Sequence, residues 1–123
     1  METEDAKRNF ERRFTAYNSG RLGRLRHWHF KLIFSKILER IARKRQTSYR
    51  RRVNLPWGEK INVLCPDTTS LEISRFGFYE EGLTQMVLEY VKPGMTFLDV
   101  SAHIGYYMLL AAWLVGDRGP FLR

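Results

Sequence analysis

Cysteine is almost missing from this sequence: the 123 residues include one, Cys65. A single cysteine excludes an internal disulfide and fits a reducing compartment. No histidine stands at a spacing that would pair with its thiol. We therefore expect Cys65 to be a buried strand residue, not a nucleophile.

Long apolar runs are also missing. No stretch reaches the roughly 18–20 apolar residues needed to span a bilayer, and residues 28–41, which come nearest, are interrupted by Lys31, Lys36 and Arg40. The first residues carry mixed charge and contain no secretory signal. His27 and His29 have no third ligand at zinc spacing. We expect a cytoplasmic protein with no metal site.

Negative charge is scarce in the first part of the chain. Residues 1–52 hold sixteen Lys and Arg against five Asp and Glu, whereas residues 53–123 hold five against eight. The apolar fraction of 44% suits a folded chain. We predict a basic helical arm over residues 1–52 and a mildly acidic domain over residues 53–123.

Two helices are expected in the arm. Residues 1–20 predict a short or frayed helix, ended by Asn18-Ser19-Gly20. Residues 21–46 predict a longer, basic amphipathic helix with a wide apolar face from Trp28 to Ile41. That face could pack on the domain or on a second copy, which we favour, or could lie on an anionic membrane surface.

Two short basic clusters end the arm, Arg43-Lys44-Arg45 and Arg50-Arg51-Arg52. Such clusters can contact nucleic-acid phosphates. Only Tyr49 adds an aromatic residue between them, and no nucleic-acid-binding motif accompanies them. We expect a solvated linker here and no nucleic-acid partner.

The domain is predicted to begin with a β-hairpin. Residues 53–65 indicate two strands around Trp57-Gly58-Glu59, followed by a turn-rich connection over residues 66–70. Residues 80–91 predict a helix that Pro93-Gly94 ends.

Residues 95–107 are the most informative stretch. Thr96 to Val100 predicts a strand, small residues then predict a loop, and residues 106–115 predict an apolar helix. A strand, a small-residue loop and a helix form the ligand cradle of many α/β domains. Asp99, at the end of the strand, suits a ligand with an ammonium or hydroxyl group better than a pyrophosphate. S-adenosylmethionine carries both groups.

The segment from Val91 to Tyr107 resembles the first cofactor motif of FkbM-type methyltransferases. That motif runs approximately K-P-G-D-x-V-x-D-V-G-A-N-I-G-Y-Y, and the preceding Gly77-Phe78-Tyr79-Glu80-Glu81 also resembles the family. The chain departs from the motif in having Ser101 in place of glycine and His103 in place of asparagine. The resemblance implies S-adenosyl-L-methionine as cofactor. The cofactor-binding residues that it implies are Asp99, Ser101, Ala102, His103, Gly105 and Glu80.

The resemblance also implies a fold and an activity. The fold is α/β, an incomplete Rossmann-like methyltransferase domain of class I, preceded by the arm and the hairpin. The activity is methyl transfer to a hydroxyl of a sugar or secondary metabolite. The family's next strand would begin at Gly119, so we expect an N-terminal fragment that binds the cofactor poorly by itself. No catalytic residue can be named.

Apolar surfaces of residues 96–100 and 106–115 would be left exposed in such a fragment. We therefore expect poor solubility or a homo-oligomer. The competing hypothesis is a non-catalytic basic amphipathic module that binds an anionic membrane surface or a protein partner, with residues 21–46 making a peripheral membrane contact.

Overall fold

The computed structural model describes residues 2–100 and 102–116. Over these residues the chain is α/β, with five helices and one two-stranded antiparallel sheet. The elements in order are α1 (Thr3–Asn18), α2 (Gly20–Lys44), β1 (Tyr49–Asn54), β2 (Lys60–Cys65), α3 (Thr68–Phe76), α4 (Glu81–Tyr90) and α5 (Tyr106–Val115). None of the helices in this described part is long and apolar enough to cross a membrane.

Helix α1 is part of the core. Ala6, Phe10 and Phe14 recur every four residues, so they share one face of the helix, and all three are buried. The helix is sixteen residues long. The expectation of a short or frayed helix is therefore wrong, because these contacts stabilise the helix along its length.

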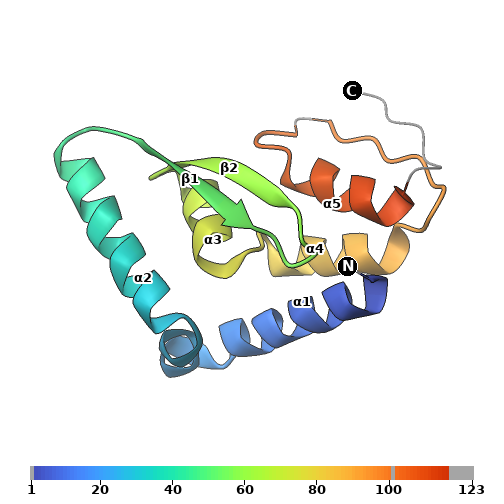
Figure 1. Ribbon diagram of the computed structural model, residues 1–123, viewed down its shortest axis with the longest axis horizontal. Helices are drawn as coiled ribbons and strands as arrows, with labels where there is room; N and C mark the ends of the chain where they lie inside the picture. Colours follow the sequence, from blue (N-terminus) through green and yellow to red (C-terminus); the bar gives the residue numbers. More distant parts are fainter. Residues whose placement is uncertain (1, 101, 117–123) are drawn as a thin grey trace.

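Helix α2 is confirmed, but it is bent. Trp28 has non-helical angles (φ −121°, ψ 23°), and the helix changes direction there (Figure 1). The buried residues of α2 are Trp28, Leu32, Ser35 and Ala42. After the bend, Ser35 and Glu39 of α2 contact Arg75 of α3.

The predicted β-hairpin is confirmed, but its first strand, β1, begins at Tyr49. The expectation of a solvated linker at Arg50-Arg51-Arg52 is therefore wrong, because these residues pair with β2. Tyr49 pairs with Cys65 at one end and Asn54 pairs with Lys60 at the other. Side chains of β2 alternate between exposed and buried, and Cys65 is buried as expected. Trp57, between the strands, stacks on Phe10 with ring centroids 5.7 Å apart.

Helix α3 occupies residues expected to be a turn. The Asp67 side chain accepts a hydrogen bond from the Ser70 N–H at 3.1 Å, which caps the helix. Gly77 ends it with φ 80°. The Arg13 guanidinium donates to the Phe76 carbonyl at 2.8 Å and so links α1 to this end. The prediction of an irregular connection over residues 66–70 is wrong beyond Asp67.

Helices α4 and α5 are confirmed close to their predicted bounds, and they pack against each other. The strand predicted at Thr96–Val100 is wrong. A strand needs a neighbour to pair with its backbone, and the strands in the described residues pair only with each other. The proposed start of a further strand at Gly119 lies outside the described residues.

One core joins both parts of the chain. Figure 1 shows α1 and α4 running along the lower side, with the hairpin and α3 at the centre, α2 at one end and α5 towards the other. Phe10 and Phe14 of α1 share the core with Trp57, Phe78 and Leu110. The change in charge near Val53 is therefore not a break in packing over the described residues.

Candidate functional site

The predicted cofactor loop borders a small hollow. Asp99, Ala102 and His103 line it, together with side chains from α3, from Tyr79 and from the start of α5. The volume of the hollow is about 170 Å³. The complete lining is Thr69, Tyr79, Asp99, Ala102, His103, Ile104, Tyr106 and Tyr107. Three of the predicted residues are therefore close together in space.

Glu80 reaches this site through Tyr107. The Tyr107 hydroxyl lies 2.9 Å from the Tyr79 carbonyl oxygen and 3.3 Å from Oε2 of Glu80. Tyr107 itself lines the hollow, whereas Glu80 does not line it and is exposed. Glu80 therefore contacts the first turn of α5, and its role in cofactor binding stays a prediction.

Unusual backbone angles are concentrated in this region. Glu80 (φ 48°) and His103 (φ 50°) are two of the three described non-glycine residues with positive φ. Such angles cost of order 1 kcal/mol for a residue with a side chain and often occur at functional sites. Gly105 (φ 82°) has no such cost and lies directly before α5. The loop conformation therefore depends on a glycine at position 105.

The Tyr79 carbonyl accepts hydrogen bonds from both α4 and α5. The Thr84 hydroxyl donates to the carbonyl oxygen at 2.6 Å, and the Tyr107 hydroxyl donates to the same oxygen at 2.9 Å. Oγ1 of Thr84 also lies 3.3 Å from the hydroxyl of Tyr106. Burial raises the pKa of both tyrosine hydroxyls, so they remain protonated at neutral pH and serve as donors, not as bases.

Acidic groups gather near the hollow, although the chain carries a net charge of +8. Asp99 lines the hollow, and the Glu80 carboxylate lies 3.3 Å from the hydroxyl of Tyr107, which also lines it. Burial, and secondarily the neighbouring Glu80 carboxylate, raise the pKa of Glu72 on α3. This local charge favours a cationic ligand group over an anionic one.

The prediction of the site was incomplete. Ser101 lies outside the described residues, and Gly105 shapes the loop without lining the hollow. Tyr107 and Tyr79 were within the segments that resemble the family, so a signal for them existed. No feature of the sequence indicated Thr69, because this residue was predicted to lie in a turn and not on a helix.

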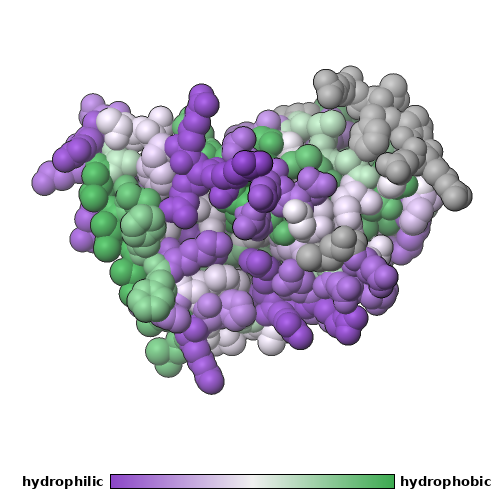
Figure 2. Space-filling view, in the orientation of Figure 1, coloured by the Kyte–Doolittle hydropathy of each residue, from purple (hydrophilic) through white to green (hydrophobic). Residues whose placement is uncertain are grey.

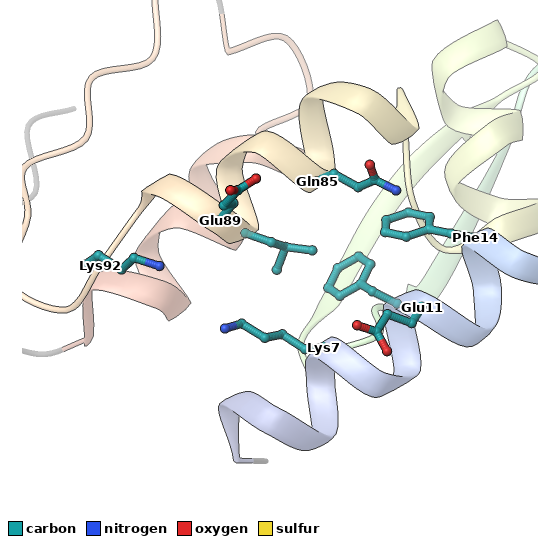
Figure 3. A pocket seen from close by; sticks show the side chains of 8 residues that line it. Lys7, Glu11, Phe14, Gln85, Glu89 and Lys92 are labelled. Atoms are coloured by element: carbon teal, nitrogen blue, oxygen red, sulfur yellow. The ribbon is translucent and has the colours of Figure 1, made fainter.

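A second depression lies between α1 and α4. Figure 3 shows Lys7 and Glu11 on one side and Gln85, Glu89 and Lys92 on the other, and the groove measures about 370 Å³. Its floor is formed by Phe10, Phe14 and Leu88. The charges on its rim balance, and none of the predicted cofactor residues lines it. The groove therefore offers no comparable set of functional groups.

Comparisons with known proteins identify no family: no family model, no curated protein and no solved structure matches the chain. Within residues 2–100 and 102–116, no three His, Cys, Asp or Glu side chains are grouped as metal ligands.

Proposed function

We propose that this chain belongs to an S-adenosylmethionine-dependent methyltransferase of the FkbM type, and that the hollow beside Asp99 is one wall of the cofactor site. The observation that carries the proposal is the convergence of Asp99, Ala102 and His103 with Tyr107 and its Glu80 contact. These residues come from two segments that independently resemble the family.

The residues present suit the amino-acid end of the cofactor. The Asp99 carboxylate, which lines the hollow, would bind its ammonium group through a charge-assisted contact, and the exposed Glu80 carboxylate beside Tyr107 would add to the attraction. Ala102 and Gly105 leave room for the ligand near the backbone. The positive φ of His103 is also informative, because the family's asparagine at that position tolerates the same conformation.

The contribution of the chain to catalysis would be positioning. S-adenosylmethionine supplies an electrophilic methyl group when bound, and transfer to a hydroxyl of a sugar or secondary metabolite needs the acceptor in line with it. The Tyr107 hydroxyl donates to the Tyr79 carbonyl at 2.9 Å, which fixes the tyrosine at the hollow, and the Glu80 carboxylate lies 3.3 Å from the same hydroxyl. We assign no general base for the acceptor hydroxyl.

Weak binding of the cofactor is expected for residues 1–123. Pockets that enclose small molecules measure about 300–1,000 Å³, whereas this hollow measures about 170 Å³. It can contact the amino-acid end of S-adenosylmethionine while leaving much of the remainder in solvent. We therefore expect a dissociation constant near about 1 mM, about −4 kcal/mol.

The test is a titration of the chain with S-adenosylmethionine, followed by the backbone amide resonances in NMR spectra. We expect shifts at Ala102, His103 and Gly105, and binding that Asp99→Asn weakens about tenfold, as loss of a charge-assisted contact implies. Glu89→Gln, which removes an exposed acid on α4, serves as the matched control and should bind normally. Shifts confined to the groove between α1 and α4, or no shifts at all, would refute the proposal.

A further inference from the structure

Helix α2 carries apolar side chains on two opposite sides. Its buried side, formed by Leu32, Ser35 and Ala42 after the bend at Trp28, faces the rest of the protein. A second set recurs at spacings of three and four residues, which places it on one stripe of the helix, away from the buried side. This outer stripe consists of Phe30, Ile33, Phe34, Ile37 and Ile41.

The outer stripe is exposed along its length. Phe30 is 80% exposed and Ile41, the least exposed of the five, is still 46% exposed. Figure 2 shows the corresponding hydrophobic surface along the edge of the molecule where α2 lies, with hydrophilic side chains beside it. A contiguous apolar surface of this kind marks an interaction site in a soluble protein.

Positive charge borders the outer stripe. Residues 20–44 contain eight Lys and Arg but a single acid, Glu39. Glu39 is turned towards α3, where it pairs with Arg75, and it also pairs with Arg43. By helical spacing, Lys36 and Arg40 lie on one flank of the stripe and Lys31 lies on the other. No acid on α2 therefore offsets these cations.

Strand β1 adds to this charge. The Arg51 guanidinium lies 5.6 Å from the centroid of the Phe34 ring, so a cation is held directly at the edge of the stripe. Desolvation, followed by repulsion from Arg13 and Arg51, lowers the pKa of Lys31. Lys31 and Arg51 are close enough to repel each other at this face, and an anionic partner would relieve that repulsion.

We propose that the outer stripe of α2 is a docking surface for an anionic phospholipid bilayer. A helix with an apolar stripe flanked by Lys and Arg lies in the interfacial plane, with its apolar side chains among the acyl chains and its cations at the headgroups. A second copy of this chain fits less well, because a symmetric contact through the stripe would bring the same cations together. An anionic bilayer satisfies both the apolar stripe and its charged flanks.

The test is sedimentation of the full 123-residue chain with lipid vesicles. We expect binding to vesicles of phosphatidylcholine with about 30% phosphatidylserine, and at least about tenfold weaker binding to phosphatidylcholine alone. Raising the salt from about 0.1 M to about 0.5 M should weaken the binding to the anionic vesicles. Equal binding to both compositions, or to neither, would overturn the proposal.

Two pairs of substitutions separate the apolar and the charged contributions. Phe30→Gln with Ile37→Gln should reduce the affinity for anionic vesicles at least about tenfold, and Lys36→Gln with Arg40→Gln should also reduce it. Because these side chains are exposed, the variants should retain the wild-type circular dichroism spectrum and melting temperature.

Matched controls remove comparable groups elsewhere. Leu64→Gln with Met86→Gln changes two apolar residues that are 51% and 50% exposed, and Lys60→Gln with Lys92→Gln removes two exposed cations. Both control pairs should bind anionic vesicles as the wild type does. Losses as large as those of the α2 variants would show that binding is not specific to the stripe.

The proposal would also be overturned if the protein does not bind vesicles but forms a dimer in solution, and if Phe30→Gln with Ile37→Gln dissociates that dimer. This result would assign the stripe to self-association.

Discussion

Replacing Phe10 with alanine tests whether α1 is an integral part of the fold. Phe10 is fully buried, its ring lies 5.7 Å from that of Phe14, and it stacks on Trp57 at the same distance. Removing the ring would leave a cavity between α1 and the hairpin. If α1 were an appended arm, the same change would have little effect on the stability of the protein.

The expected loss is large. Truncation of a buried Phe to Ala costs about 3–5 kcal/mol, and loss of aromatic contacts on two sides places this case near the middle, at about 4 kcal/mol. A domain of this size has a free energy of unfolding of about 5–15 kcal/mol. With about 3–5 °C per kcal/mol for such a chain, the melting temperature should fall by roughly 12–20 °C.

The assay is urea and thermal unfolding followed by circular dichroism. Phe30→Ala is the matched control, because it makes the same chemical change on α2 at a side chain that is 80% exposed. Its effect should stay within about 0.5 kcal/mol. Equal effects of the two substitutions would refute the conclusion that α1 belongs to the core.

Three further predictions concern other parts of the fold. Gly77→Ala should lower the free energy of unfolding by about 2 kcal/mol, because φ is 80° there and the new Cβ would lie 2.6 Å from Nη1 of Arg13. Gly94→Ala should lower it by about half as much, because φ is 82° but the new Cβ would meet no atom within 4 Å. Desolvation raises the pKa of Glu39, but its hydrogen bonds to Arg75 and Arg43 outweigh this effect and lower the pKa overall, so the ionised carboxylate stabilises the fold. The free energy of unfolding should therefore fall as the pH drops below about 4.5, and it should fall less steeply in Glu39→Gln. Burial raises the pKa of the Cys65 thiol, so a thiol reagent should label it at least about a hundredfold more slowly in the native than in the urea-unfolded protein.

Each of these three measurements has a clear contrary outcome. Equal losses for the two glycine substitutions would remove the role assigned to contact with Arg13. An acid unfolding curve unchanged by Glu39→Gln would show that its pairing with Arg75 does not contribute. Rapid labelling of the native protein would contradict the burial of Cys65 in β2.

The strongly patterned elements could be predicted from the sequence. The hairpin alternates and is followed by Pro66, and α4 and α5 are apolar helices bounded by glycine or proline segments. Helix α3 was missed because residues 66–70 also suit a turn. The deciding contact, from the Ser70 N–H to the Asp67 side chain, is a local capping signal that the sequence did contain.

Other features depend on tertiary packing. Residues 96–100 have the composition of a strand, but a strand also requires a pairing neighbour, and composition cannot supply one. For the site, the motif placed Asp99, Ala102 and His103 together, because they are close in sequence. The contribution of Thr69 could not be predicted, since it depends on how α3 packs near the loop.

The arrangement around the Tyr79 carbonyl restricts how the sequence can vary. A carbonyl oxygen has two lone pairs, and the Thr84 and Tyr107 hydroxyls occupy both. In a library randomised at positions 84 and 107, folded variants should therefore keep serine or threonine at the first and tyrosine at the second. Serine or threonine at position 84 should thus be selected together with tyrosine at position 107, although the two positions are 23 residues apart.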